Sequence, residues 1–438
     1  MITENGTAGG DTTGRGLLQT VDWRLIGCWL ALVLFGWINI YAAVRSGEPT
    51  SIFDLNCNAG KQALWIGTSM ILAILILFVI NPHLWEVISI PSYAVVYVLL
   101  VAVIFLSKDV KGSHSWFELG PVKFQPAELS KITTSLVLAA FMSRPNFKMS
   151  NRRDFLIAAA IVIFPMLTIV AESETGSALV YVGFIFLFYR EGFSGWFLFM
   201  MGMAILLFIL TLVTNWWISM IVLGVVCLAY YINVLRHSRK AARVRRTSLR
   251  NVILAFAAGV AMIFATNFLF NHVLQDHQRA RIEVLLGMKE DPAGVGYNVR
   301  QSMIAIGSGG FFGKGYLNGT QTTYGFVPEQ STDFIFCTVG EEWGFVGCLF
   351  VILVYALMIA WIIQDADRAR ESFTRIYGYG LASCLFMHLF INIGMTIGLM
   401  PVIGIPLPLL SYGGSSLWAF SIMIFIFIAL YRQEKKFF

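Results

Sequence analysis

The chain has 438 residues, of which 57% are hydrophobic and only 13% are charged. Soluble domains carry roughly 25% charged residues, so this composition excludes a soluble enzyme and indicates a polytopic membrane protein. The apolar runs do not alternate with polar residues as barrel strands do. The spans are therefore expected to be helices, which satisfy their own backbone hydrogen bonds in lipid. The six cysteines form no C-x-x-C pair, which argues against a disulfide framework or a zinc site.

The segment from Met1 to Gly16 is rich in Gly and Thr and lacks the charged start and short apolar run of a signal peptide. It predicts a disordered cytoplasmic tail over residues 1–20, followed by a single transmembrane domain over residues 21–438.

Apolar runs of membrane-crossing length predict an all-α polytopic membrane protein with about twelve transmembrane helices. The run at 176–190 is shorter than the others. The predicted spans lie near residues 24–44, 61–80, 87–106, 125–143, 154–172, 176–190, 195–213, 217–235, 251–271, 344–363, 378–400 and 411–431.

Most of the 31 Lys and Arg residues fall in alternate segments between these spans, on the same side as the two termini. Basic residues accumulate on the cytoplasmic side of a membrane, so both termini are predicted to be cytoplasmic. The basic run from Arg236 to Arg250 could be a nucleic-acid patch, but its place between two spans favours a topology anchor at anionic headgroups. No nucleic-acid partner is expected.

The same topology places four connecting segments outside the cell membrane, namely Ser107 to Phe124, Glu172 to Thr175, His272 to Trp343 and Met400 to Ser416. The third, at about 70 residues, is far longer than an ordinary connection and too rich in apolar and aromatic residues for disorder. It is therefore predicted to be functional.

An aromatic segment leads into the span near 125–143 through the sequence GSHSWFELGPVKFQPAELSK, residues 112–131. Pro126 is typical of a first helical position, and Glu128 and Lys131 are then i, i+3 neighbours on one helix face. One interpretation is an aromatic anchor at headgroup level followed by a capping carboxylate. The other is the lining of a lipid-headgroup cavity, which is favoured because ionisable residues near a span are usually paired and functional.

Basic residues and glycines occur together in the sequences HQRARI, from His277 to Ile282, and GYNVRQSMIAIGSGGFFGKG, from Gly296 to Gly315. Arg and Lys beside closely approaching backbone suit a phosphate ligand. The spacing fits neither nucleotide-binding glycine motif, so no nucleotide site is predicted. Purely structural glycine turns remain the alternative.

Asp333 follows a polar loop and precedes an apolar run in the sequence VPEQSTDFIF, residues 327–336. Burial would raise the pKa of its carboxyl and a nearby cation would lower it, and in either case it could act as a general base toward a sugar hydroxyl. Ser331, Thr332 and Asp333 are also good N-cap residues, so a helix-capping role is the alternative.

The stretch from Asn392 to Ser416 reads NIGMTIGLMPVIGIPLPLLSYGGSS and cannot form a regular helix, because it holds three prolines and a pair of glycines. Irregular backbone at membrane depth survives only where protein or a water-filled cavity covers it. His388, in the preceding span, is interpreted as a satisfied interhelical residue and not as a ligand. No HExxH or Gly-x-Ser-x-Gly motif occurs, which argues against a zinc protease or a serine hydrolase.

These four motifs, in this order and on one predicted side of the membrane, resemble the SEDS family of bacterial cell-wall polymerases from about Trp23 to Arg432. The block from Asn392 to Gly414 is most similar to the rod-shape, or elongation, branch, and the division branch is the nearest alternative. The family core of about ten helices is smaller than the number of spans predicted from length and hydropathy, which implies an extra helix pair within 195–250.

The resemblance implies a peptidoglycan glycosyltransferase that polymerises lipid II on the outer face of the bacterial cytoplasmic membrane and releases undecaprenyl pyrophosphate. The implied partners are a class B penicillin-binding protein and other membrane proteins of the elongation complex. Alternatives of another class are a lipid-precursor flippase and a scaffold. The chain shows no internal repeat, and its ionisable residues cluster on the outer side instead of along a path, which argues against transport.

By this resemblance, Asp333 matches the family's catalytic Asp, the base that deprotonates the 4-hydroxyl of the acceptor GlcNAc. The leaving pyrophosphate needs positive charge, which arginine, lysine or a divalent cation such as Mg²⁺ or Mn²⁺ could supply, and no organic cofactor is expected. The residues predicted to line the cavity or bind substrate are Trp116, Glu128, Lys131, Arg279, Arg281, Lys314, Glu329 and Ser411.

One turn departs from the family pattern. Where the family usually shows Q-P-D-x-G-T, this chain has the sequence ESETGS from Glu172 to Ser177, without the proline and with a longer acid. No precise role is therefore transferred to Glu174.

Overall fold

The computed structural model describes residues 21–45, 51–107, 115–119, 122–237, 242–274, 276–286, 288 and 295–435. The predicted N-terminal tail lies outside the described residues, as does part of the glycine- and serine-rich segment before Trp116.

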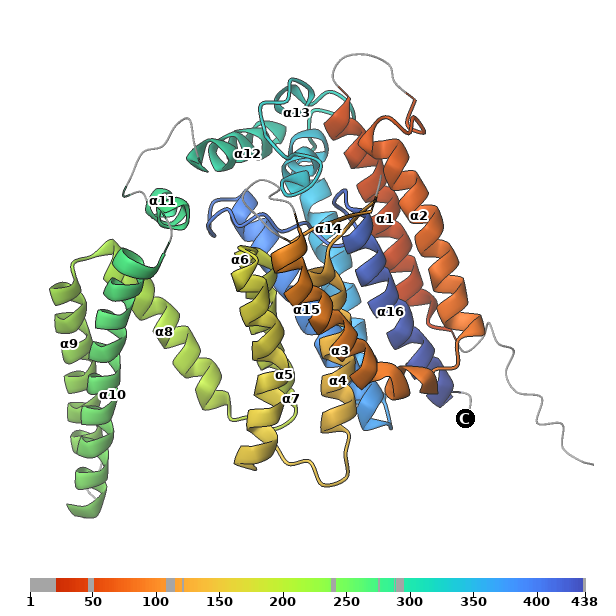
Figure 1. The fold of residues 1–438 in the computed structure, drawn as a ribbon. Helices are drawn as coiled ribbons and strands as arrows, with labels where there is room; N and C mark the ends of the chain where they lie inside the picture. The colour runs from red at the N-terminus through yellow and green to blue at the C-terminus, as the bar shows by residue number, and fades with distance from the viewer. Residues whose placement is uncertain are drawn as a thin grey trace, which may run out of the picture. The chain divides into compact units, whose positions relative to one another are not determined.

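The described residues are almost entirely helical (Figure 1), as the hydropathy pattern predicts. The helices are α1 (Trp23–Val44), α2 (Asn58–Ile74), η1 (Leu75–Val79), α3 (His83–Leu106), α4 (Pro126–Met142), α5 (Arg152–Ala171), α6 (Thr175–Val180), η2 (Tyr181–Gly183), α7 (Phe184–Arg190), α8 (Gly195–Val213), α9 (Trp216–His237), α10 (Ala242–Phe268), η3 (Leu269–Val273), α11 (Asp276–Leu285), α12 (Val295–Gly309), α13 (Thr320–Thr323), α14 (Ile335–Arg368), α15 (Ser372–Thr396) and α16 (Gly414–Lys435). A short antiparallel hairpin, β1 (Phe117–Leu119) and β2 (Val122–Phe124), directly precedes α4.

Ten helices among the described residues are long and apolar enough to cross a membrane, so the predicted number of about twelve is not confirmed. The two other predicted spans, 125–143 and 176–190, correspond to shorter elements. Helix α4 has 17 residues, or roughly 26 Å at the helical rise, slightly less than a hydrocarbon core of about 30 Å. The stretch Thr175–Arg190 is divided by the 3₁₀ turn at Tyr181–Gly183.

The chain forms two compact units. The first takes its residues from Met1–Gly192, Gln301–Ile397 and Ile403–Phe438, and the second from Phe193–Arg300 and Gly398–Val402. The second unit contains α8, α9 and α10, of which α10 packs against both α8 and α9. The expectation of a single domain, with an extra helix pair within 195–250, stays a prediction.

Helix α15 is the central element of the first unit, where it packs against α4, α7, α14 and α16. Helices α1 and α2 pack against each other (Figure 1). Helix α1 packs mainly against α14, and α2 packs against α16. Both α15 and α16 are mostly buried, whereas α2, α3 and α5 expose most of their apolar side chains, as helices that face lipid do.

Helix α14 is broken at Gly344, where φ is 62° and ψ is −157°. Two amides of the glycine-rich run 310–315 donate hydrogen bonds to the carbonyls of Glu341 and Glu342, and helix amides beyond the break donate back to the run. A Cβ at Gly313 would lie 2.1 Å from the carbonyl oxygen of Glu342. The glycines are therefore needed for close backbone packing, which is the structural interpretation of this run.

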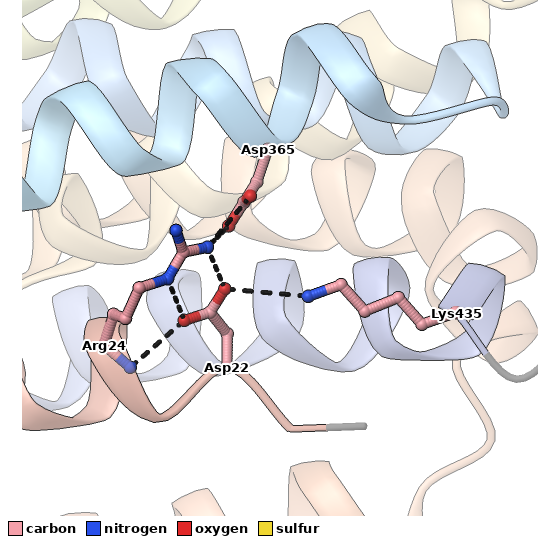
Figure 2. A network of polar contacts seen from close by, with 4 residues as sticks. All are labelled: Asp22, Arg24, Asp365 and Lys435. Atoms are coloured by element: carbon pink, nitrogen blue, oxygen red, sulfur yellow. Dashed lines mark hydrogen bonds and ion pairs between the residues drawn. The ribbon is translucent and has the colours of Figure 1, made fainter. Parts of the chain in front are cut away.

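A charged network joins the ends of three helices of the first unit (Figure 2). Asp22 caps α1 by accepting the backbone amide of Arg24 at 3.1 Å. The Arg24 guanidinium lies 2.6 Å from Asp22 and 3.1 Å from Asp365 on α14, and the Lys435 ammonium on α16 lies 3.8 Å from Asp22. Burial opposes the ionisation of Asp22, but the hydrogen bonds and the charge of Arg24 outweigh it and lower the pKa of this carboxyl to about 2.

We expect Asp22→Asn to lower the unfolding free energy by about 1–2 kcal/mol, a modest figure because the Arg24 side chain is 40% exposed. The pKa of Asp22 in the folded protein lies below its value of about 3.9 in an unfolded chain, so its stabilising contribution is complete at neutral pH. It is lost as the pH falls from about 4 toward 2. Thermal unfolding of the purified protein in detergent at pH 7 measures the effect, and Asp54→Asn in the loop before α2 is the control. Equal melting temperatures for wild type and Asp22→Asn would contradict it.

A second carboxyl, Glu172 at the C-terminus of α5, is fully buried. Burial and the nearby charge of Glu174 raise the pKa of Glu172 to about 8. Because the folded state favours the protonated acid, stability is expected to fall as the pH rises from about 4 to 8. Glu172→Gln should remove this dependence and raise the unfolding free energy at pH 8 by at least about 1 kcal/mol. Melting curves between pH 5 and 8 test this, and a variant that melts earlier than wild type at pH 8 would show that the carboxylate is stabilising.

Candidate functional site

Asp333 lies in the turn that leads into α14, where it is partly exposed. The next three residues, Phe334 to Phe336, are buried, as their apolar sequence predicts. The N-cap position of α14 is Phe334 and carries no side-chain cap, so Asp333 does not occupy the capping position. The main chain of Asp333 is fixed by Asn392 of α15, whose Nδ2 donates to the Asp333 carbonyl at 2.8 Å.

The carboxylate of Asp333 lies against the proline-glycine segment, residues 403–413. Gly404 has a φ of +72°, and a Cβ at this position would lie 3.3 Å from Asp333 Oδ2. Glycine therefore allows both the left-handed backbone conformation and the close approach of the main chain to the carboxylate. The structure thus brings together two of the four motifs that are separated in the sequence.

The backbone of the proline-glycine segment is irregular, as predicted, and neighbouring side chains satisfy it. His388 Nδ1 lies 3.1 Å from the Pro406 carbonyl, and Asn392 Nδ2 donates to the Ile405 carbonyl at 2.7 Å. The Tyr355 hydroxyl on α14 donates to the Pro408 carbonyl.

Ser411 lies within the proline-glycine segment and is buried. Its Oγ accepts the amide of Leu407 at 2.8 Å, and its own amide donates to the Leu407 carbonyl at 2.9 Å. These bonds stabilise the conformation of the proline-glycine segment. The predicted contact of Ser411 with substrate stays a prediction.

Glu128 and Lys131 form the predicted pair on α4, which begins at Pro126 as expected. Lys131 Nζ lies 2.8 Å from Glu128 Oε1 and 2.9 Å from His388 Nε2, and it lies over the Phe420 ring at 5.0 Å. Both members of the pair are buried, with relative exposures of 2% for Glu128 and 0% for Lys131. His388 is thus a satisfied interhelical residue, as interpreted from the sequence.

A groove of about 510 Å³ opens beside this pair between α2, α4 and α16. Its lining is mostly apolar, with Thr68, Gln125, Glu128 and Ser415 as polar members, which suits a ligand with a long apolar part and a polar end. The lining residues are Thr68, Ile71, Leu72, Phe124, Gln125, Glu128, Leu129, Ser415, Trp418 and Ile422. Trp116 precedes β1 and is partly exposed.

Lys314 is engaged within the protein. Its Nζ lies 2.7 Å from Glu341 Oε1, and the two oxygens of this carboxylate also accept the backbone amides of residues 320–322 at 2.8–2.9 Å. Glu341 and Lys314 therefore fold the loop between α12 and α14. Glu329 is exposed in the same loop, with its Oε2 at 3.2 Å from Thr332 Oγ1.

Arg279 and Arg281 lie on α11 in the second unit. Arg279 donates to Glu283 and Asn271, each at 3.1 Å, and its guanidinium lies 5.0 Å from the centre of the Phe270 ring. No group of three or more His, Cys, Asp or Glu side chains in the described ranges is placed to hold a metal ion. The expectation of a divalent cation stays a prediction.

Two residues of this arrangement were not predicted. Asn392 is completely buried in α15 and binds the main chains of both motifs that meet at Asp333. A lone amide inside an apolar span was the available signal, because polar side chains there must find partners. The role of Glu341 in holding the loop depends on contacts between residues far apart in sequence, which no local pattern reveals.

Comparison with known proteins places the chain in one family. The family model FTSW_RODA_SPOVE, described as "Cell cycle protein", matches residues 22–249 and 244–436. The chain is 32% identical to the peptidoglycan glycosyltransferase MrdB of Escherichia coli K12, over 93% of this chain and 92% of that protein. It is also 32% identical to the peptidoglycan glycosyltransferase RodA of Treponema pallidum, over 91% and 94%.

The division branch is less similar, since the FtsW protein of Haemophilus ducreyi is 25% identical. The fold is also that of a solved chain from a peptidoglycan synthase complex, with a TM-score of 0.67, 24% identity and coverage of 94% of this chain and 98% of that one. The predicted SEDS membership is thereby confirmed: the chain belongs to the FtsW/RodA/SpoVE family.

Proposed function

We infer that this chain is a peptidoglycan glycosyltransferase that acts in cell elongation. Its family membership and its similarity to MrdB and RodA, which exceeds its similarity to FtsW, support this function. We propose lipid II as the substrate, which the protein joins into glycan strands. The observation that carries the mechanism is the position of Asp333, a partly exposed residue whose carboxylate lies beside the backbone of the proline-glycine segment.

In the proposed reaction, Asp333 takes the proton from the 4-hydroxyl of the acceptor GlcNAc. The resulting oxygen attacks the anomeric carbon of the second, lipid-linked sugar, and the bond from that carbon to the pyrophosphate breaks. The configuration inverts because the oxygen attacks opposite the leaving group. A general base needs access to the hydroxyl and a fixed position, and both the exposure of Asp333 and its anchored main chain meet this need.

Undecaprenyl pyrophosphate leaves as a dianionic or more highly charged group and needs compensating positive charge. Lys314 is already paired with Glu341, which makes it a weak candidate. The contribution of Arg279 and Arg281 stays a prediction. A divalent cation carried by the pyrophosphate itself would supply the same charge. The groove beside Glu128 fits the isoprenoid chain of such a lipid, because its lining is mostly apolar.

We propose that the active site faces outward from the bacterial cytoplasmic membrane and that both termini are cytoplasmic. Asp22, Arg24 and Lys435 meet Asp365 near the C-terminal end of α14, whereas Asp333 precedes its first residue. The part of α14 beyond its break at Gly344, residues 345–368, is roughly 36 Å long at the helical rise, which still exceeds a hydrocarbon core of about 30 Å. The charged network and Asp333 therefore belong to opposite faces.

A class B penicillin-binding protein is the proposed partner. The solved chain reported above, which shares this fold, comes from a peptidoglycan synthase complex that coordinates polymerization and crosslinking. A transpeptidase that crosslinks new strands would be most effective beside the enzyme that makes them. Other membrane proteins of the elongation complex are proposed as neighbours.

Purified protein, alone and with its cognate transpeptidase, is expected to polymerise lipid II in detergent or vesicles. Asp333→Asn should lower the rate by at least about 10²-fold, because it keeps the shape of the side chain but removes the base. Gel analysis of labelled glycan strands measures the rate. Asp54→Asn, in the loop between α1 and α2, is the matched control and should polymerise normally.

Polymerisation by Asp333→Asn at the wild-type rate, with the protein folded, would refute the role of Asp333. Flipping of lipid II across vesicles without polymerisation by wild type would instead favour a transporter.

A further inference from the structure

We propose that His388 and Asn392 form a clamp on α15 that positions Asp333, and that the Glu128–Lys131 pair acts on the reaction through this clamp. The two clamp residues are four positions apart and therefore lie on one face of the helix. The proposal rests on the proposed function, because it takes Asp333 as the base. It assigns positioning roles to His388, Asn392 and Lys131, none of which touches the reacting atoms.

Asn392 connects the two irregular backbone segments that meet at the Asp333 carboxylate, namely the turn before α14 and the proline-glycine segment. Its single Nδ2 group donates to the Asp333 carbonyl at 2.8 Å and to the Ile405 carbonyl at 2.7 Å. The amide has two N–H donors, so one nitrogen can serve both carbonyls. Since Gly404 packs against the carboxylate of Asp333, the same side chain sets the distance between the base and the backbone beside it.

His388 extends the clamp by one helical turn toward α4. The Lys131 ammonium can only donate, so His388 Nε2 must accept its hydrogen bond. The ring proton is thereby assigned to Nδ1, which donates to the Pro406 carbonyl at 3.1 Å. The Phe420 ring meets the imidazole edge to face at 4.9 Å and limits its rotation.

The proposal assigns Lys131 an indirect influence on the reaction, along this path. Its side chain has 0% exposure and is surrounded by Glu128, His388 and Phe420, so a sugar or pyrophosphate cannot reach its ammonium group. Removing one partner of a buried ion pair leaves an uncompensated charge, which would shift the surrounding groups. The shift would pass through the imidazole to Pro406 and the backbone beside Asp333. A displacement of about 1 Å at a catalytic group can cost roughly 10²-fold in rate.

The test compares substitutions that remove the clamp with one that keeps it. His388→Leu and Asn392→Leu remove the donors without a large change in volume. His388→Gln keeps both bonds, since its Oε1 can accept from Lys131 and its Nε2 can donate to Pro406. Tyr377→Phe is the matched control. It removes another buried hydrogen bond of α15, which the Tyr377 hydroxyl donates to the Met423 carbonyl on α16 at 3.2 Å. Tyr377 is separated from His388 and Asn392 along the chain.

Two readouts are needed. Steady-state polymerisation should show kcat lowered by about 10-fold or more in both leucine variants, with KM changed by less than about 3-fold, because positioning affects the transition state more than binding. His388→Gln and Tyr377→Phe should stay within about 3-fold of wild type. Hydrogen exchange should be faster in peptides that cover 329–336 and 403–413 in the leucine variants only.

Unchanged exchange in these two stretches for the leucine variants would overturn the clamp, whatever the activity. A rise in KM at constant kcat for Lys131→Met would show that Lys131 acts on substrate binding, directly or through Glu128 in the groove, and would overturn its role through the clamp. If wild type did not polymerise lipid II while the exchange pattern appeared as described, the clamp would stand as a structural device and the proposed function alone would fail.

Discussion

The structure depends on one constraint: irregular backbone inside a membrane protein must find hydrogen-bond partners within the protein. The proline-glycine segment, residues 403–413, cannot satisfy itself as a helix does. Side chains from α14 and α15 bind its carbonyls instead, namely Tyr355, His388 and Asn392. Asn392 also holds the main chain of Asp333. The side chain that satisfies a carbonyl of the segment therefore also positions the proposed base.

The break in α14 at Gly344 follows the same logic on another part of the first unit. There the partners are backbone groups of the run 310–315. Glycine is required because no side chain fits between this run and α14. Buried charge is also stabilised by partners within the protein, since the Glu341 carboxylate accepts hydrogen bonds from the Lys314 ammonium and three backbone amides. A loop that connects two helices is thus fixed by internal bonds and can hold Asp333 steady for catalysis.

Much of this could be predicted from local sequence. Hydropathy predicted an all-α membrane fold, Pro126 predicted the start of α4, and the i, i+3 spacing predicted the contact of Glu128 with Lys131. Span length was harder, because α4 and the divided stretch 175–190 are apolar but short. Asn392 and Glu341 could not be assigned roles, since their partners lie tens of residues away and are brought close only by tertiary packing. The glycine run was open to a phosphate-binding interpretation until its contact with α14 was known.

We propose that Asp333 contacts the acceptor sugar while the Glu128–Lys131 pair helps to hold it in position through His388. A cryo-electron microscopy structure of the full chain with its transpeptidase and non-reactive lipid II analogues would test this most directly. In that structure we expect the Asp333 carboxylate to lie within hydrogen-bond distance of the acceptor 4-hydroxyl, about 2.6–3.2 Å, with Lys131 still bound to His388. An acceptor hydroxyl bound to Lys131 or Glu128 and distant from Asp333 would contradict it.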